Sequence, residues 1–231
     1  MARKKEMCSS ENHEPGAGIV LMKLEELHSF EGHPFKVERN QELFELRCSI
    51  EKEGVLVPLL VRKNPHGDGY EIIAGHRRKE AALWAGLTEV PVIIRELDDD
   101  QSVIAMVDSN LQREKILPSE KAFAYKMRLE AMKRQGFRSD LTSDPVGQKF
   151  SVEKIADNSN DSKTQIQRYI RLTNLVPELL EFVDEGRIKM RPAVELSYLD
   201  EDCQRDVVDE IDLNDATPSH DQTIRMRKLF N

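Results

Sequence analysis

The stretch "GHRRKEAA", which begins at Gly75, places two arginines where a helix is expected to start. A helix N-terminus carries partial positive charge and is unfavourable for cations. A glycine there lets the backbone approach a ligand closely, and the free N–H groups of the first turn can bind an anion. Because guanidinium groups bind phosphate oxygens in pairs, Arg77 and Arg78 indicate a phosphate site. Ordinary ion pairs with Glu80 and Glu114 would explain them equally well.

A second set of phosphate-binding side chains lies in "DSNLQRE", residues 108–114. On a helix, residues three or four apart share a face, so Ser109 and Asn110 would both lie beside Arg113. Together with the first stretch, they could form a cradle for a polyphosphate. The sequence contains no Walker-type loop, no nucleophile–base pair and no cluster of carboxylates. The residues therefore favour binding over catalysis.

The stretch "SVEKIADNSNDSKTQIQRYIRL", residues 151–172, has the rhythm of a helix-turn-helix. A short helix with one apolar face precedes a polar turn, and Ser162 is a suitable N-cap with Gln165 at the capping-box position. Amide, hydroxyl and guanidinium groups on the second helix could read base edges and hold phosphates. We expect Ile166, Tyr169 and Ile170 to face inward. The candidate DNA-binding residues are Ser162, Lys163, Thr164, Gln165, Gln167, Arg168 and Arg171, with an outward face formed by Lys163, Thr164, Gln167, Arg168 and Arg171. A surface helix pair in a bundle is the alternative.

The periodicity of the chain predicts an α+β protein, with a small mixed sheet followed by helices alone. Residues 1–18 read as a disordered tail. The first part is expected to hold a strand beginning at residue 19, a helix capped by Asn40, a hairpin, a helix ended by Gly86, and a last strand. The hairpin and last strand are expected at 57–62, 70–74 and 89–97. Helices are then expected at 101–110, 118–135, 151–157, 162–172, 177–186, 191–199 and 201–211, with a loop at 136–150 and a final helix capped by Ser219.

The charge of the chain is unevenly distributed, which bears on its binding partners. Net charge is −8 over 231 residues, but residues 113–191 hold 16 Lys+Arg and 12 Asp+Glu, an excess of four cations. A locally basic middle is compatible with a polyanion there. No apolar run is long enough for a membrane span, and the polar N-terminus does not resemble a secretory signal. Three scattered cysteines fit a reducing cytoplasm.

The ordered motifs resemble the ParB/RepB family of chromosome and plasmid partition proteins. "GVLVPLLVR" is similar to the family's G-x-x-x-P-L-x-V-R segment, and "GHRRKEAALWAGL" is similar to its G-E-R-R box. "SNLQREKILPSEKAFAY" resembles its E-N-x-Q-R-E helix, and the helix-turn-helix follows at the expected distance. The chain departs from the pattern in several places. His76 replaces the box glutamate, Ser109 replaces the family's metal-assisting glutamate, and Val57 replaces a polar residue before the proline.

The resemblance implies that the N-terminal domain binds CTP with Mg²⁺. The phosphates would be held by Gly75, His76, Arg77, Arg78, Ser109, Asn110 and Arg113, and the base side would involve Pro58, Leu59, Val61 and Arg62. Asn110 would also contact the metal. The expected domains are a ParB-like nucleotide-binding domain at 19–112 and a helical DNA-binding domain at 113–231, without the family's C-terminal dimerisation domain.

The same resemblance implies a function. A dimer would bind a centromere-like site in double-stranded DNA and use CTP to close into a sliding clamp, with at most slow CTP hydrolysis. A ParA-type partition ATPase, and condensin in chromosomal systems, are the implied partners. The protein would be cytoplasmic and associated with the nucleoid. Two alternatives remain: a nucleotide-independent transcriptional regulator on the same scaffold, and an enzyme such as a phosphotransferase or nuclease.

Overall fold

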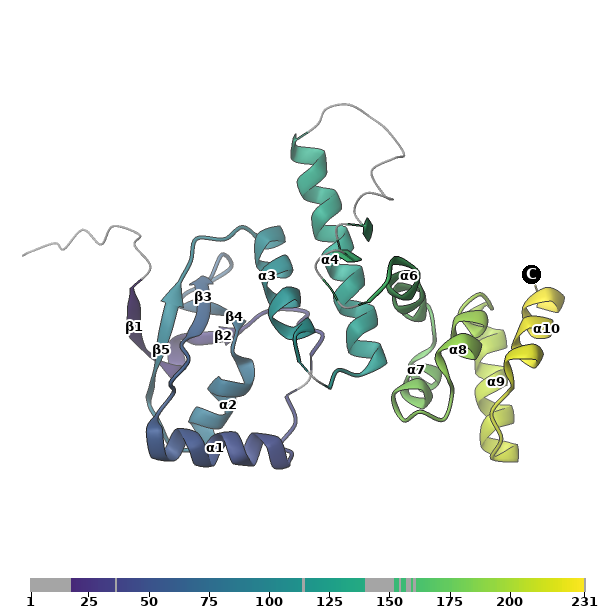
Figure 1. Ribbon diagram of the computed structural model, residues 1–231, viewed down its shortest axis with the longest axis horizontal. Helices are drawn as coiled ribbons and strands as arrows, with labels where there is room; N and C mark the ends of the chain where they lie inside the picture. Colours follow the sequence, from purple (N-terminus) through teal and green to yellow (C-terminus); the bar gives the residue numbers. More distant parts are fainter. Residues whose placement is uncertain are drawn as a thin grey trace, which may run out of the picture. The chain divides into compact units, whose positions relative to one another are not determined.

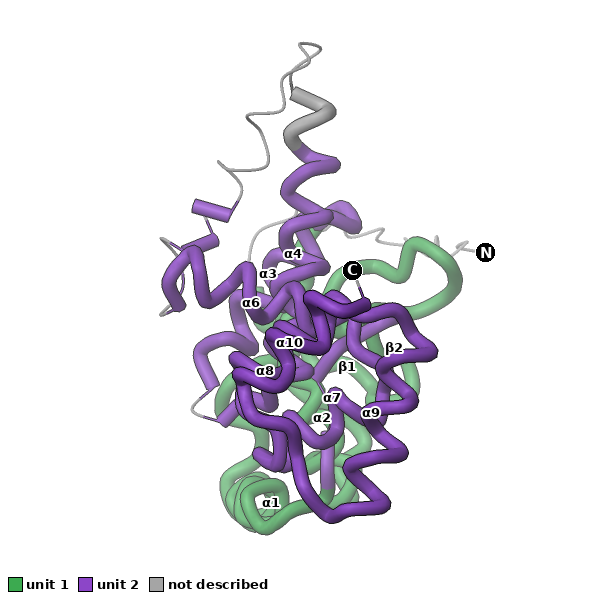
Figure 2. Tube along the Cα trace, turned by 90° about the vertical axis from the view of Figure 1, so that its right-hand side faces the viewer, with its two compact units in different colours: residues 1–30, 39–96 green, residues 31–38, 97–231 purple. Residues whose placement is uncertain are grey.

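The chain folds into two compact units in the computed structural model (Figure 2). Unit 1 comprises residues 1–30 and 39–96, and unit 2 comprises residues 31–38 and 97–231. The structure describes residues 18–35, 37–113, 115–139, 152–153, 155–156, 159 and 161–230.

A five-stranded mixed sheet forms the centre of unit 1 (Figure 1), with the strand order β1-β5-β3-β4-β2. Strands β3 and β4 form the expected antiparallel hairpin, and β3 also runs parallel to β5. At the two edges, β1 pairs antiparallel with β5, and β2 pairs parallel with β4. The strands are β1 (Ile19–Lys23), β2 (Leu27–Ser29), β3 (Leu59–Lys63), β4 (Tyr70–Ala74) and β5 (Glu89–Ile94). A short 3-10 helix, η1 (Leu24–Glu26), links the first two.

Two helices complete unit 1 and begin and end where the sequence predicts. Helix α1 (Gln41–Glu53) is capped by Asn40, whose side chain accepts a hydrogen bond from the backbone N–H of Leu43. Helix α2 (His76–Trp84) is followed by Gly86, which has φ +79° and so adopts the left-handed conformation of a helix C-terminus. The two helices pack against each other, and α2 also contacts β3.

A buried ion pair joins the hairpin strands of unit 1. Arg62 of β3 lies opposite Glu71 of β4, and its Nε and Nη2 lie 2.7 and 2.6 Å from Glu71 Oε2. Only 5% of the arginine side chain and 8% of the glutamate side chain are exposed. The guanidinium also lies over the ring of Phe30. Because a buried charge is desolvated, removing either partner would leave the other charge uncompensated and would destabilise the fold.

The described secondary-structure elements of unit 2 are helices, and the first two are joined by the Asp100–Arg134 and Asp108–Arg128 ion pairs. Helix α3 (Asp99–Leu111) starts with a capping box between Asp98 and Gln101. Helix α4 (Pro118–Ser139) has proline at its first position, as predicted. Residues 136–139 are helical, so the prediction that a loop starts at 136 is wrong; residues 140–150 of that loop lie outside the described residues.

The remaining helices agree with the sequence in type and order. Val152, Glu153, Ile155 and Ala156 are helical. Then come α6 (Lys163–Leu172), α7 (Pro177–Asp184), α8 (Met190–Leu196), α9 (Glu201–Asn214) and α10 (His220–Phe230). Ser219 caps the last helix by accepting a hydrogen bond from the N–H of Gln222, as predicted. The predicted fold class, α+β with a helical second part, is confirmed.

The buried Arg62–Glu71 pair leads to a stability prediction. Arg62→Ala or Glu71→Ala leaves one charge buried without its partner, so each should lower the free energy of unfolding by about 3–5 kcal/mol. The double change Arg62→Met with Glu71→Leu should leave the free energy of unfolding unchanged or raise it, by up to about 4 kcal/mol. Urea denaturation followed by circular dichroism measures this, and parent-like stability of both single variants would contradict the assignment.

Candidate functional site

The N-terminus of α2 is open to an anion in the way the sequence suggests. Gly75 stands at the N-cap position with φ 110°, and no side chain caps the helix. The first turn contains no acidic residue. Its backbone N–H groups therefore point toward a site that attracts negative charge. His76, the first helical residue, is buried with 7% of its surface exposed.

Gly75 is required because the backbone passes directly over strand β3. A Cβ at this position would lie 2.8 Å from Cγ of Leu59, closer than real side chains approach. Arg78 strengthens the same contact, since its Nη1 donates to the carbonyl oxygens of Val57 and Pro58 at 2.7 and 2.6 Å. The structure thus brings the "PLLVR" and "GHRR" segments together, as the proposed site requires.

Among the described residues, Arg77 and Arg78 do not form the ion pair with Glu80 that the sequence offered as an alternative explanation. Arg77 Nη2 lies 3.1 Å from Glu42 Oε2 of α1, while Glu80 pairs with Arg39 at 2.8 Å. Glu114 lies outside the described residues. Partial burial lowers the pKa of Arg78, which means that its charge is partly desolvated and would gain from a nearby anion.

The base-side candidates are mostly inaccessible. Leu59 and Val61 are fully buried core residues, and Arg62 is committed to Glu71. Pro58 is half-buried. If this segment contacts a ligand, the backbone and Pro58 are the parts within reach, and the role of all four residues stays a prediction.

The second phosphate set lies at the end of α3, in unit 2. Asn110 is buried, and its Nδ2 donates to the Met106 carbonyl at 2.8 Å. Ser109 Oγ donates to the same carbonyl. The guanidinium of Arg113 lies over the ring of Phe35, with 5.5 Å to the ring centroid. The structure holds each phosphate set together within its own unit, and joint use of the two sets stays a prediction.

The end of α3 does not fit a protein-built magnesium site. Mg²⁺ is usually held by one or two carboxylates together with phosphates and water. Asp108, the described carboxylate next to Ser109, lies 2.6 Å from Arg128 Nη1 of α4. Burial raises the pKa of Asp108, and the Arg128 charge opposes that rise. Among the described residues, no group of three or more His, Cys, Asp or Glu side chains could hold a metal ion.

The helix-turn-helix is confirmed in its packing. Val152, Ile155 and Ile166 are buried in one cluster with Tyr125 of α4, and Ala156, Tyr169 and Ile170 pack against it. Ser162 caps α6 by accepting a hydrogen bond from the N–H of Gln165, as predicted.

A polar network fixes the start of the second helix, which we call the recognition helix (α6). Asp161 Oδ2 accepts hydrogen bonds from Lys121 Nζ at 2.9 Å and from the Tyr125 hydroxyl at 2.7 Å. Burial, followed by the bond to Asp161, raises the pKa of Tyr125, which therefore stays a neutral donor. Sequence reasoning missed this network, because nothing in the spacing links residue 161 to helix α4.

The predicted outward face of the recognition helix is correct except at one position. Thr164 and Gln167 are exposed, and Lys163 pairs with Glu153 at 2.5 Å. Within the described part of the chain, Arg168 makes no side-chain hydrogen bond or ion pair.

The prediction that Arg171 faces outward is wrong. Its Nη2 donates to the Ser197 carbonyl at 2.9 Å, and its guanidinium stacks 3.9 Å from the ring centroid of Tyr198. Arg171 therefore ties the recognition helix to the end of α8. A contact between Arg171 and DNA stays a prediction.

Comparison with known proteins agrees with this geometry. The sequence matches the family models of the ParB N-terminal domain over residues 9–111 and of the ParB HTH domain over residues 146–219. The chain belongs to the ParB family.

Among curated relatives, the chromosome-partitioning protein Spo0J of Thermus thermophilus is 36% identical over 173 residues, which are 75% of this chain and 57% of that protein. The stage 0 sporulation protein J of Bacillus subtilis is 35% identical over 173 residues, 74% of this chain and 55% of that protein. The chain thus spans about half the length of these relatives.

A solved structure is also similar. The C-terminally truncated ParB of Caulobacter crescentus, complexed to the centromeric parS site, has a TM-score of 0.53 and 26% identity, and the match covers 91% of this chain and 99% of that one.

Arg168 and Arg171 should respond differently to truncation. Arg168→Ala should remove a base or phosphate contact and lower affinity for cognate DNA by about 1–3 kcal/mol, with unchanged thermal stability. Arg171→Ala should lower the melting temperature, because it removes the link to α8. Fluorescence anisotropy with cognate and scrambled duplexes, beside thermal melts, separates the two. Unchanged discrimination in Arg168→Ala would show that this residue does not read DNA.

Proposed function

We propose that this protein is a partition protein that binds a centromere-like DNA site and uses CTP to close around DNA. The observation that carries the proposal is the ordered pair of family domains, each with its functional segment in a fitting local geometry. The similarity to a Caulobacter ParB complexed to its parS site supports the DNA part.

The recognition helix is the proposed DNA reader. Thr164, Gln167 and Arg168 supply hydroxyl, amide and guanidinium groups, which can recognise base edges in the major groove. Lys163 and the N-terminus of α6 would neutralise and hold phosphates. Ser162 caps the helix and Gln165 is its capping-box partner, so we assign them to the geometry of the helix start as much as to DNA contact.

The N-terminus of α2 is the proposed nucleotide phosphate site. Backbone N–H groups after Gly75, together with Arg77 and Arg78, would bind the triphosphate oxygens. We propose Ser109, Asn110 and Arg113 as further phosphate ligands, in line with the family resemblance. Nucleotide binding would displace Arg77 from Glu42. The Arg77–Glu42 ion pair is exposed, so breaking it costs little free energy.

CTP hydrolysis, if it occurs, would be slow. The position of the family's metal-assisting glutamate is Ser109, and the adjacent Asp108 is paired with Arg128. Nothing in this arrangement activates water, so we assign binding and closure to the site rather than turnover. Nucleotide-dependent closure of a homodimer would then let the protein slide from its loading site along DNA.

The remaining expectations from the family are part of the same proposal. Partners would be a ParA-type ATPase and, in a chromosomal system, condensin, and the protein would act on the nucleoid in the cytoplasm. No helix among the described residues has the length and apolar character that crossing a bilayer requires. We propose that the boundary between the two domains lies at residue 112. The match to the N-terminal family model ends one residue before it, at residue 111.

One observation favours a second candidate function. Ser109 and the Asp108–Arg128 pair leave α3 without a described free carboxylate near the proposed phosphates. A DNA-binding regulator with the same fold that works without a nucleotide would not need a free carboxylate at this position. Crosslinking between copies with and without CTP distinguishes the two candidates.

The nucleotide site is tested with matched arginine variants. Arg77→Ala should weaken CTP binding about tenfold or more, because one charge-assisted phosphate contact is worth about 1.5–3 kcal/mol. Arg205→Ala is the control, since Arg205 is also an exposed arginine paired with a glutamate but belongs to α9, which is not part of the proposed site. Isothermal titration with CTP, in the presence and absence of cognate DNA, gives the affinities. Equal affinities for both variants and the parent would contradict the site.

The DNA site is tested by selection from a random duplex pool. Rounds of binding at physiological salt should enrich one short palindrome, and its affinity should fall steeply as salt rises because phosphate contacts release counterions. Enrichment of no sequence, or affinity that is indifferent to salt, would contradict specific DNA binding.

A further inference from the structure

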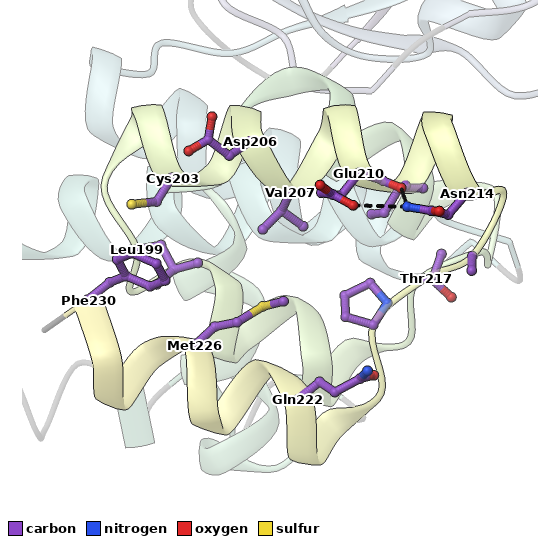
Figure 3. Close-up of a pocket in the computed structure, with 13 residues that line it drawn as sticks. Leu199, Cys203, Asp206, Val207, Glu210, Asn214, Thr217, Gln222, Met226 and Phe230 are labelled. Atoms are coloured by element: carbon purple, nitrogen blue, oxygen red, sulfur yellow. Dashed lines mark hydrogen bonds between the residues drawn. The ribbon is translucent and has the colours of Figure 1, made fainter.

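A groove of about 490 Å³ lies between helices α9 and α10 (Figure 3). Its floor and walls are mostly apolar, with Val207 of α9 and Met226 of α10 turned into the space between the helices. Leu199 and Phe230 line one end, and Thr217 lies at the other. The groove runs along both helices, which is the shape that a third helix would fill.

The groove stays open because α10 is held by other contacts. Helix α10 packs on α8. Arg227 lies 3.0 Å from Glu195 and stacks 3.6 Å from the ring centroid of Tyr198. These contacts hold α10 against α8. Among the apolar residues that line the groove, Phe230 is exposed and Val207 and Met226 are partly buried, so part of their surface is available to a ligand.

The α9 side of the groove is strongly acidic. Residues 200–215 carry eight carboxylates and a single arginine, and that arginine, Arg205, pairs with Glu201. Asp206 and Glu210 belong to the groove lining itself, which contains no Lys or Arg. An apolar groove with an acidic wall along α9 is complementary to a helix that carries leucine-type side chains on one face and cations beside them.

We propose that this groove binds a basic amphipathic helix of a partner protein. Apolar side chains spaced three and four residues apart would insert between α9 and α10, and flanking lysines or arginines would pair with Asp206 and Glu210. This contact is separate from the DNA-reading and nucleotide sites, because none of the groove residues belongs to either proposal. It gives the protein a further docking surface beyond DNA.

The proposal is tested with synthetic peptides about four helical turns long. The probe carries leucines every third or fourth position and lysines beside them. One control peptide has glutamates in place of the lysines, and another has the same composition with scrambled leucines. Fluorescence anisotropy with the full chain should show binding of the probe that weakens with salt, and much weaker binding of both controls.

Matched variants locate the binding. Asp206→Asn with Glu210→Gln should weaken binding of the probe about fivefold to tenfold, since two charge contacts are lost. Asp209→Asn with Asp212→Asn removes the same charge from exposed positions of α9 outside the groove lining, and should have less than about twofold effect. Val207→Ala, which removes apolar contact surface from the groove lining, should also weaken binding of the probe, with parent-like circular dichroism showing that the fold is intact.

Three outcomes would overturn the proposal. They are equal loss of binding in the groove and control double variants, equal binding of the lysine and glutamate peptides, and binding unaffected by Val207→Ala. A second copy of this chain could also fill the groove, since its α10 exposes Arg225, Lys228 and Leu229. Sedimentation velocity tests for such self-association. Concentration-dependent association that Val207→Ala abolishes would assign the groove to self-association instead.

Discussion

The Asp161 carboxylate is the contact on which the DNA-reading part of unit 2 depends. It accepts hydrogen bonds from Lys121 and Tyr125 of α4, and the next residue, Ser162, caps the recognition helix. The start of that helix is thereby fixed on α4, and the apolar cluster around Ile166 fixes its rotation. Helix α4 is itself bound to α3 through the Asp100–Arg134 and Asp108–Arg128 ion pairs. A helix that must meet base edges with a defined register needs such rigid support.

In unit 1, the comparable constraint is the close approach of the α2 N-terminus to strand β3. Gly75 sits against Leu59, and Arg78 donates to the two carbonyls just before that strand. Arginines at a helix N-terminus are unfavourable in isolation. Here one is offset by two carbonyl oxygens and the other by Glu42, and both remain close to uncapped N–H groups. A bound phosphate would add to these contacts, which is why the site is suited to an anion even though it is stable without one.

The features that depend on neighbouring residues, such as helix caps and turns, can be predicted from the sequence. The polar contacts between residues far apart in the chain are seen only in the structure. The Asn40 cap, the hairpin, the end of α2 at Gly86 and the Pro118 start follow from capping, turn and periodicity rules, and all are observed. The edge strand β2 could not be foreseen, because it has three residues and owes its form to pairing with β4. Arg171 was misjudged for a similar reason. Arg171 lies on the polar side of α6, but Ser197 and Tyr198, at the end of α8, contact its side chain there.

We propose that DNA reading and nucleotide binding belong to one partition activity of this protein. Chromatin immunoprecipitation with sequencing, performed in the cells from which the gene derives, tests it most directly when parent and Arg77→Ala proteins are compared. We expect one sharp peak with broad flanks for the parent, and the same sharp peak without flanks for Arg77→Ala, because loading needs the recognition helix and spreading needs the nucleotide. Flanks that are equal in both proteins, or the absence of any peak for the parent, would contradict it.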